Sequence, residues 1–342
     1  MNQTAVRQFL MCDGPTAFEV ERAPRRQPTA NEIEVEVAAT SVNPIDARRA
    51  EGYGRRLLSL FGAGRLPLVL GNDFSGVVTG VGSKVATFKP GDRVFGVKPT
   101  SSEGTHASHI IVKAIPAQVR IAPGAQSLQT LAALPYSFVT MWLAVRDAGL
   151  TKGNAAGKSV LVHGAAGGLG TLALQMLSTW GARITAVAKP SSFYECRKAG
   201  AAAVVDSTAK PFAALTGVFD ATLNFASWED ELLMLGCLRE GALGHATTVH
   251  PLLRNFDELG WLRGALKTAS DKRRSRAALP KGVKNYHWTV FRPEEMALTE
   301  LSQLIAERRI DLPVGKQASL DDATKAFMHV RERQRGRALI LP

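Results

Sequence analysis

Four glycines lie between an apolar segment and a leucine-rich segment in the stretch "VLVHGAAGGLGTLALQM", residues 160–176. Glycine is favoured where φ must be positive, or where a Cβ would collide with another backbone or with a ligand. If such a bend joins a buried strand to a helix, the first helical N–H groups and the positive end of the helix dipole face outward together. The chemistry that this arrangement predicts is anion binding, and a diphosphate fits it.

The window "AAGGLG" compares with the dinucleotide-binding pattern G-x-G-x-x-G. Gly167 and Gly170 supply the second and third glycines, and Ala165 replaces the first. Gly167 would allow close approach of the pyrophosphate, and Gly170 would let helix and strand pack. A glycine-rich connection without a ligand has the same local sequence, but the surrounding strand and helix signals favour the nucleotide. The predicted cofactor-binding residues of the turn are Gly164, Ala165, Gly167, Gly168, Leu169 and Gly170.

The next predicted strand, "ARITAVAKPSS", bears on which nicotinamide dinucleotide binds. A free ribose 2′-hydroxyl is usually held by an Asp or Glu at the end of this strand. This chain has Lys189, Ser191 and Ser192 there, which can hydrogen-bond a 2′-phosphate. The sequence therefore favours NADPH over NADH, although Lys189 is equally consistent with a solvated strand end.

Cysteines and histidines show no catalytic or metal-binding spacing. Cys12, Cys196 and Cys237 are scattered without a C-x-x-C motif, which argues against a disulfide framework and a thiolate zinc cluster. The histidines are interpreted as structural, although His163 directly precedes the glycine turn. Because no G-x-S-x-G motif occurs, a serine hydrolase is disfavoured.

Two kinds of element pattern surround these residues. Up to about residue 125, alternating segments such as "EIEVEVAAT" and frequent glycines predict an irregular antiparallel β domain. After it, strand and helix signals alternate, which predicts βαβ units on a parallel sheet. A later strand "YHWTVF", an amphipathic helix after Pro293 and a final strand in "GRALILP" complete the predicted elements.

The order of several motifs carries a family resemblance. The segments "SVNPID", "LPLVLGNDFSGVV", "FKPGDRVFG", "ALPYSFVTMWLAV" and "VLVHGAAGGLG" resemble the zinc-free quinone oxidoreductase branch of the medium-chain dehydrogenase/reductase superfamily. The later segments "TVHPLLRNFDELG" and "KGVKNYHWTVFRP" are similar to the mitochondrial reticulon-interacting NAD(P)H oxidoreductases. The resemblance implies an α/β fold, with a GroES-like antiparallel β catalytic domain and a doubly wound parallel Rossmann domain that together form a cofactor cleft. The expected division is 1–126 and 293–342 for the catalytic domain and 127–292 for the Rossmann domain.

Zinc-containing relatives differ from this chain at their metal ligands. They carry a Cys near Asn43, a Gly-His-Glu where this chain has Gly71-Asn72-Asp73, and another Cys near Pro135. Asparagines are poor substitutes in a site that needs nitrogen and sulfur ligands, so no metal is expected. Without a Lewis acid, reduction of an electrophilic acceptor is easier than oxidation of an alcohol. The predicted function is NADPH-dependent reduction of a quinone or an α,β-unsaturated carbonyl.

The resemblance also implies residue roles. Asn43 would lie beside the nicotinamide and the acceptor, with Asp46 behind it, and Tyr53 is chosen as a hydrogen-bond donor to the acceptor oxygen. Asn-Pro and Asp also favour structural turns, and a tyrosine can cover a core edge, so these readings stay open. For the cofactor, the resemblance implies contacts from Thr140 and Asn224. Positive charge is expected from Arg333, in a cluster with Arg331 and Arg337; surface arginines are the alternative.

Composition sets the remaining expectations. A net charge of +12 attracts anions but does not identify a particular anionic ligand. The basic run Lys267–Arg276 is interpreted first as a solvated face, and an anionic membrane or a nucleic acid are the alternative contacts. No nucleic-acid partner and no transmembrane segment are expected, and the lack of an export signal suggests a cytoplasmic location. An NADPH-binding regulatory protein with little turnover is the alternative function. A homodimer is expected through pairing of residues 285–291 with their copy.

Overall fold

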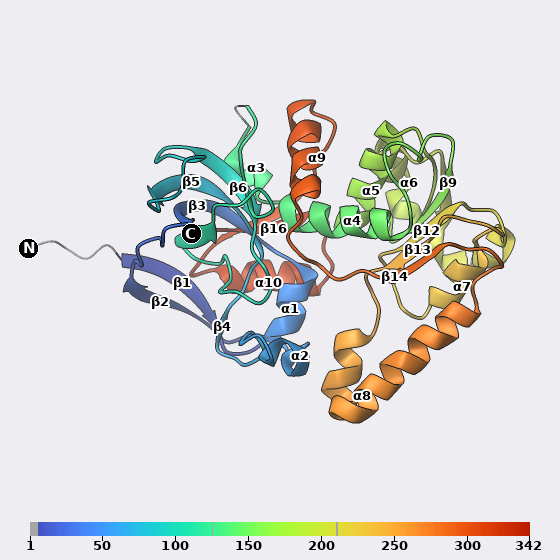
Figure 1. Cartoon of the computed structure of the whole chain (residues 1–342), viewed down its shortest axis with the longest axis horizontal. Helices are drawn as coiled ribbons and strands as arrows, with labels where there is room; N and C mark the ends of the chain where they lie inside the picture. Colours follow the sequence, from blue (N-terminus) through green and yellow to red (C-terminus); the bar gives the residue numbers. More distant parts are fainter. Residues whose placement is uncertain (1–5, 125, 210) are drawn as a thin grey trace, which may run out of the picture. The chain divides into compact units, whose positions relative to one another are not determined.

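Strand β3 shows how the sequence pattern becomes structure in the computed structural model of this chain (Figure 1). In β3 (Glu32–Val42), Ile33, Val35 and Val37 are buried, whereas Glu36 is exposed. The apolar side of the predicted two-residue alternation is confirmed here, because successive side chains of a strand point to opposite faces. Glu34 is also buried, and it forms an ion pair with Arg25.

Two compact units make up the chain, which the structure describes over residues 6–124, 126–209 and 211–342. Unit 1 comprises Met1–Tyr136 and Arg292–Pro342, and unit 2 comprises Ser137–Phe291. The domain boundaries expected from the sequence lie after residue 126 and after residue 292. Residues 1–5 and 125, which belong to the expected first domain, lie outside the described residues.

Unit 1 is built mostly from antiparallel strands. A small sheet has the order β2-β1-β4, and a larger one has the order β15-β16-β3-β5-β6-β8, with β7 also pairing with β3. The strands are β1 (Val6–Cys12), β2 (Phe18–Pro24), β4 (Leu68–Val69), β5 (Asp73–Val81), β6 (Arg93–Val97), β7 (His109–Lys113), β8 (Val119–Ile121), β15 (Val314–Ser319) and β16 (Arg337–Leu341).

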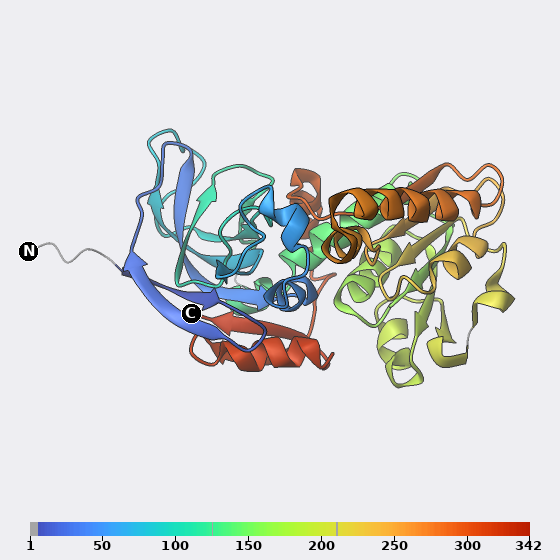
Figure 2. The same cartoon turned by 90° about the horizontal axis from the view of Figure 1, so that it is seen from below.

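Both ends of the sequence contribute to unit 1. The last strand, β16, pairs antiparallel with β3 and parallel with β15. Figure 2 shows this red C-terminal segment beside the blue N-terminal strands. The helices of the unit are α1 (Pro44–Ala50), α2 (Arg55–Ser59), α3 (Leu128–Leu131), α9 (Glu295–Ala306) and α10 (Ala323–Arg331).

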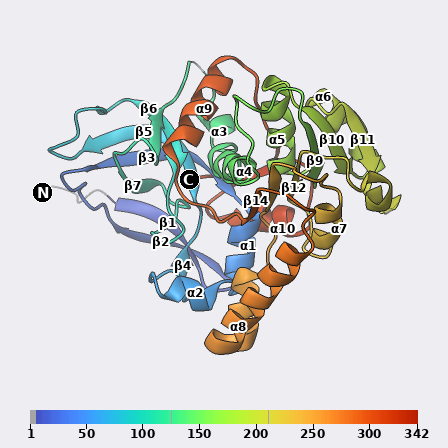
Figure 3. The same ribbon diagram turned by 45° about the vertical axis from the view of Figure 1, so that its right-hand side comes forward.

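Unit 2 contains a parallel sheet of six strands in the order β11-β10-β9-β12-β13-β14. Numbered from the first strand of the unit, this is 3-2-1-4-5-6, the doubly wound dinucleotide-binding order. Figure 3 shows β11, β10, β9 and β12 next to one another in this order. The strands are β9 (Ser159–His163), β10 (Arg183–Ala188), β11 (Ala203–Asp206), β12 (Ala221–Asn224), β13 (Gly244–Thr247) and β14 (Asn285–Trp288).

Helices connect these parallel strands, as crossovers require. Helix α5 packs on β9 and β10, and α7 packs on β12. The helices are α4 (Pro135–Asp147), which begins in unit 1, α5 (Gly168–Thr179), α6 (Phe193–Lys198), α7 (Glu231–Gly236) and α8 (Leu252–Ala277), with short 3₁₀ turns at Pro190–Ser192, Ser207–Ala209 and Pro211–Leu215. The expected fold class, an antiparallel β domain with a doubly wound parallel sheet, is confirmed.

One segment within the described residues has the length and composition of a membrane-crossing helix. Leu128–Asp147 spans 20 residues with a mean hydropathy of 1.3. In the structure, 78% of its apolar window is buried. Burial of this kind is typical of a core helix, and length and composition alone are weak evidence for a membrane span.

Candidate functional site

The glycine turn lies where the strand order of unit 2 reverses. It follows β9, which has β10 on one side and β12 on the other. Ligands of open parallel sheets bind at this switch point, outside the carboxyl ends of the strands. Helix α5 begins directly after Gly167, and no side chain caps it. Its first N–H groups, which have no intrahelical acceptor, are therefore available to an anion.

Three glycines of the turn differ in what a side chain would meet. Gly164 has φ +78°, and a Cβ on it would lie 3.0 Å from the backbone of Phe225. A Cβ on Gly170 would lie 2.3 Å from the carbonyl oxygen of Gly164, so no side chain fits there. Gly167 is exposed and has φ −78°, and a Cβ on it would meet only the carbonyl oxygen of Gly164, at 3.3 Å. The fold thus requires glycine at positions 164 and 170. At position 167 the backbone is exposed and carries no side chain, so a ligand can approach it closely.

The remaining turn residues lie as the dinucleotide pattern requires. Ala165 is buried, and its N–H donates to the carbonyl of Val187 at 3.3 Å. Gly168 and Leu169 form the first turn of α5 and are half-buried. The turn therefore fits the diphosphate of a dinucleotide, with a tight bend, close helix packing and unpaired amides in one place.

Residues at the end of β10 lie at the same sheet edge. Lys189 and Ser191 are exposed and Ser192 is half-buried, just beyond the last residue of the strand. A carboxylate that sequence reasoning missed also lies at this edge, because Asp206 of β11 is the register partner of Ala188. Its Oδ1 already accepts hydrogen bonds from the backbone and the hydroxyl of Thr208, both at 2.8 Å.

Asn224 ends β12 and shapes the loop that follows it. It is completely buried, and its Nδ2 donates to the carbonyl of Ser227 at 2.8 Å and to Glu231 Oε2 at 3.0 Å. In the sheet register Asn224 is opposite His163. His163 Nε2 lies 2.8 Å from Asp230 Oδ2, an acidic partner 67 positions away that no local spacing indicated. Both side chains therefore brace the loop beside the glycine turn.

A buried polar network continues from Asn224. Glu231 also accepts from the Tyr286 hydroxyl at 3.1 Å and lies 3.2 Å from His245 Nε2. Burial acts to raise the pKa of Glu231, but His245 and the hydrogen bonds lower it. Tyr286 is held in turn by Trp288, whose Nε1 donates to its hydroxyl at 2.7 Å. This network fixes the position of Asn224 at the sheet edge.

In unit 1, Asn43 belongs to a second buried cluster. Its Nδ2 donates to Ser41 Oγ at 3.1 Å, and its Oδ1 accepts from Arg337 Nη2 at 2.5 Å. Ser41 donates from its backbone and hydroxyl to Asp73, at 3.0 and 2.8 Å. Burial raises the pKa of Asp73 to about 6, although Arg337 and Ser41 act to lower it. Asp73, which stands where zinc-containing relatives carry the Glu of Gly-His-Glu, thus belongs to the same cluster as Asn43.

Asp46 anchors the start of helix α1. Its Oδ2 accepts from the backbone N–H of Asn43 at 2.8 Å, and its Oδ1 accepts from that of Gly71 at 3.1 Å. Asn72 is buried, and its Oδ1 has no hydrogen-bond partner. Tyr53 follows α1 and is half-buried, with the Arg48 guanidinium 3.9 Å from its ring centre.

The other predicted cofactor residues lie on separate elements. Thr140 is buried within α4 of unit 2. Arg333 is exposed in unit 1 after α10, with φ +53°. The expected arginine cluster divides, because Arg337 is buried against Asn43, while Arg331 bonds to Glu51 and to the carbonyl of Pro15.

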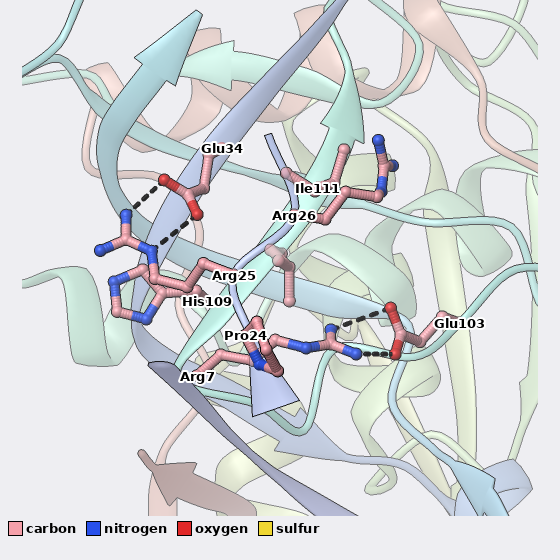
Figure 4. Close-up of a pocket in the computed structure, with 9 residues that line it drawn as sticks. Arg7, Pro24, Arg25, Arg26, Glu34, Glu103, His109 and Ile111 are labelled. Carbon is pink, nitrogen blue, oxygen red and sulfur yellow. Dashed lines mark hydrogen bonds and ion pairs between the residues drawn. The ribbon is translucent and has the colours of Figure 1, made fainter. Parts of the chain in front are cut away.

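A pocket of about 120 Å³ in unit 1 lies between charged side chains (Figure 4). Arg7 donates to Glu103 at 3.0 Å, and Arg25 donates to Glu34 at 2.8 Å. Arg26 pairs with Glu32. Since each arginine is neutralised by a glutamate, the pocket does not favour an anion.

The His, Cys, Asp and Glu side chains of the described residues bear on metal binding and on thiol chemistry. Within the described ranges, no three His, Cys, Asp or Glu side chains form a group that could hold a metal ion. The three cysteines are buried, and burial raises the pKa of Cys237 to about 11. At neutral pH that thiol is protonated, so it is neither a nucleophile nor a ligand.

Sequence comparisons assign this chain to a family. The profile described as "Alcohol dehydrogenase GroES-like domain" matches residues 29–128, and that described as "Zinc-binding dehydrogenase" matches residues 199–338. The chain is 33% identical over 325 residues to the mitochondrial NAD(P)H oxidoreductase RTN4IP1 of Danio rerio, covering 91% of this chain and 83% of that protein. The chain belongs to the NAD(P)H oxidoreductases of the medium-chain dehydrogenase/reductase superfamily. The resemblance stated from the sequence is confirmed, and the protein is an oxidoreductase.

Solved structures show the same fold for this NAD(P)H oxidoreductase. A quinone oxidoreductase from Coxiella burnetii has a TM-score of 0.81 at 20% identity, covering 99% of this chain and all of that one. An Escherichia coli quinone oxidoreductase complexed with NADPH has a TM-score of 0.73 at 22% identity, with 99% and 100% coverage. At these identities the likeness establishes the fold alone.

The expected cytoplasmic location of this oxidoreductase is wrong. Its relatives from Danio rerio, Mus musculus, Bos taurus and Homo sapiens are all named mitochondrial. The expectation rested on the lack of a charged n-region and an apolar h-region, which are features of export signals. Mitochondrial import uses amphipathic, arginine-rich segments instead, so that test does not address it.

Proposed function

We propose that this oxidoreductase uses NADPH to reduce a quinone or an α,β-unsaturated carbonyl compound. The observation that carries the proposal is the uncapped start of α5 at the switch point of the parallel sheet, with open backbone at Gly167. When bound, the dihydronicotinamide of NADPH supplies a hydride to an electrophilic acceptor. The solved structures of this fold from Coxiella burnetii and Escherichia coli are quinone oxidoreductases, the second of them complexed with NADPH, and this supports the proposal.

Cofactor preference is proposed from the end of β10. Lys189 and the hydroxyls of Ser191 and Ser192 would hold the 2′-phosphate, because a charged donor strengthens a hydrogen bond to phosphate. Asp206 opposes this preference as a nearby negative charge. Its Oδ1 is already engaged by Thr208, which weakens the opposition.

The residues of unit 1 are proposed to serve the acceptor. Asn43 and Asp46 hold the loop before α1 in one conformation through their hydrogen bonds to Ser41, Arg337 and Gly71. Tyr53 is proposed to donate a hydrogen bond to the acceptor oxygen as that oxygen gains charge. Thr140 and Asn224 are proposed to contact the cofactor within unit 2, and Arg333 to add positive charge for its phosphate.

A homodimer is also proposed. Strand β14 is the last strand of the six-stranded sheet and pairs with β13 on one side. Within the described part of the chain, no strand pairs with its other side. An edge strand presents unpaired N–H and C=O groups, so pairing with a second copy across a two-fold axis would satisfy them.

Steady-state kinetics test the proposed reaction. Oxidation of NADPH and of NADH is followed with ortho- and para-quinones and with enones. NADPH oxidation should accelerate with at least one acceptor class. Lys189→Ala should raise KM for NADPH about tenfold and leave KM for NADH unchanged, as expected for one charge-assisted hydrogen bond. Tyr53→Phe should lower kcat without changing NADPH binding.

Lys281→Ala, which removes an exposed lysine away from the turn, is the matched control for Lys189. The proposal fails if NADPH binds and no acceptor in the panel is reduced. Equal catalytic efficiency with NADPH and NADH would remove the assigned cofactor preference.

A further inference from the structure

Helix α8 is a hairpin of two helical arms. Gly260 interrupts it with φ +76° and ψ −171°, so arm 252–259 turns into arm 261–277 (Figure 1). A Cβ on Gly260 would meet no atom within 4 Å, so the turn itself is open to its surroundings. Leu259 and Trp261 flank this turn. We call Leu259, Trp261, Leu262 and Leu266 together the tip.

The two arms are fixed against each other. A Cβ on Gly264 would lie 2.8 Å from the carbonyl oxygen of Asn255, so the arms touch backbone to backbone there. Asn255 Nδ2 donates to Thr268 Oγ1 at 3.2 Å and to Asp271 Oδ2 at 3.0 Å. The contacts between the two arms are therefore made by small and polar residues. Leu252, at the start of the first arm, packs against the buried cluster that contains Tyr286 and Trp288.

Those apolar side chains are exposed at the tip. Leu259 is 42% exposed, Trp261 46%, Leu262 75% and Leu266 64%. Single exposed leucines are ordinary, but four large apolar residues around one turn form a patch that marks an interaction surface. Phe256 extends the patch, because its ring centre lies 5.8 Å from that of Trp261.

The same hairpin carries an excess of positive charge. Leu262, Leu266, Ala269, Arg273 and Arg276 are spaced three or four residues apart. Arg273 and Arg276 therefore follow the two leucines along the same face of the helical arm. Arg273, Arg274 and Arg276 are exposed. Asp271 is buried and paired with Lys267. The basic residues of the hairpin are Arg254, Arg263, Lys267, Lys272, Arg273, Arg274 and Arg276, and its acidic residues are Asp257, Glu258 and Asp271.

We propose that the α8 hairpin docks on an anionic phospholipid bilayer. The tip enters the interface, where tryptophan and leucine are stabilised, and the arginines behind it meet the phosphate and carboxylate headgroups. Charge complementarity selects this occupant, because a negative surface attracts the basic arm while its acyl boundary accepts the apolar tip. A nucleic acid would use the arginines and leave Leu262 and Leu266 exposed to water.

Vesicle binding tests the docking. Wild-type protein is floated with vesicles of phosphatidylcholine alone and of phosphatidylcholine mixed with phosphatidylserine, without cofactor or acceptor, so the result is independent of the proposed reductase function. Binding should occur with the anionic vesicles and weaken with salt. Trp261 is the most exposed of the five tryptophans, since Trp142, Trp180 and Trp288 are buried and Trp228 is half-buried. Its emission should shift to shorter wavelength on binding.

Two variants separate the apolar and charged contributions. Leu262→Ser with Leu266→Ser should weaken vesicle binding at least about tenfold, because two leucine side chains no longer leave water. Arg273→Gln, Arg274→Gln and Arg276→Gln together should weaken it about a hundredfold. The control for the first is Leu233→Ser, 51% exposed on α7, and the control for the second is the exposed set Lys113→Gln, Arg183→Gln and Lys281→Gln.

Several outcomes would overturn the proposal. One is equal binding to neutral and anionic vesicles, or none to either. Another is a loss in the control variants as large as in the hairpin variants. A dimer that dissociates when Leu262 and Leu266 become serine, without vesicle binding by the wild type, would assign the tip to a second copy. Binding of an RNA homopolymer unaffected by the leucine variant, again without vesicle binding, would assign the arginines to nucleic acid.

Discussion

Single polar residues in this protein are defined by partners far away in the sequence. Asn43 accepts from Arg337, 294 positions later, and His163 pairs with Asp230, 67 positions later. Burying such groups without partners would cost free energy, so each partner allows its polar neighbour to stay buried. The hydrogen bonds give Asn43 and Asp46 a structural role in the loop before α1, and their proposed catalytic role depends on the same fixed loop.

His250 provides a prediction on pH dependence. Its ring is stacked on Trp288 with ring centres 5.1 Å apart, and burial lowers its pKa to about 4 from the ordinary 6.5. The unfolded chain therefore binds a proton more readily, so the stability that neutral His250 contributes is present above pH 6.5 and is lost as the pH falls towards 4. Chemical denaturation at pH 7 and pH 4.5 should show that His250→Gln loses less unfolding free energy than the wild type, by up to about 3 kcal/mol.

His287→Gln, which changes an exposed histidine of β14, is the control for this measurement. It should follow the wild type at both pH values. If His250→Gln also loses as much stability as the wild type, burial of His250 is not the source of the acid sensitivity.

At the level of elements, the strand β9, the glycine turn and helix α5 form the unit that carries the cofactor proposal. The strand is buried, which suits a central position in a parallel sheet. The turn brings the start of α5 to the sheet edge, and the missing side chains allow the close packing seen at Gly164 and Gly170. Packing thus requires Gly164 and Gly170, whereas the proposed ligand requires Gly167, which lies between them.

Substitution of two of these glycines should separate the demands. Gly170→Ala places a Cβ 2.3 Å from the carbonyl oxygen of Gly164, so it should lower the unfolding free energy by about 2 kcal/mol or more. Gly167→Ala meets only one atom, at 3.3 Å, in a backbone conformation that alanine adopts. It should leave Tm nearly unchanged and weaken NADPH binding about tenfold or more, measured by calorimetric titration. If the Gly167→Ala protein binds NADPH like the wild type, the proposed diphosphate site at the glycine turn is wrong.

At the scale of the whole molecule, the two units use the chain in different ways. Unit 1 needs both ends of the chain, because β16 lies between β15 and β3. Unit 2 is one continuous segment with its own six-stranded sheet. That sheet ends at β14, whose second side is the surface proposed for dimerisation.

Sedimentation measures the proposed dimer. The chain has a mass of 36.7 kDa, and the protein at micromolar concentration should sediment at about twice this mass. Val290, 54% exposed just after β14, would approach its own copy in such a pairing. Val290→Glu should therefore favour the monomer, because like charges oppose each other across a two-fold axis. Val218→Glu, 49% exposed elsewhere, should not. A monomeric wild type would exclude the dimer.

The sequence alone determined the features that depend on local patterns. Alternation in residues 32–37, strand and helix signals after residue 126, and the glycine spacing predicted an antiparallel domain followed by βαβ units on a parallel sheet, and both are confirmed. These signals are readable because strand and helix periods and glycine requirements are properties of neighbouring residues. The family could also be inferred, since its motifs occur in order along the chain.

Only the tertiary structure decided which distant groups meet. The pairing of Arg337 with Asn43, the Asp230 partner of His163 and the position of Asp206 opposite Ala188 follow from strand order and register. The basic run at 267–276 could be identified from the sequence. The turn at Gly260, which places four apolar side chains beside that run, could not be predicted from it. Contacts of this kind depend on how elements pack across long separations, and no local pattern encodes them.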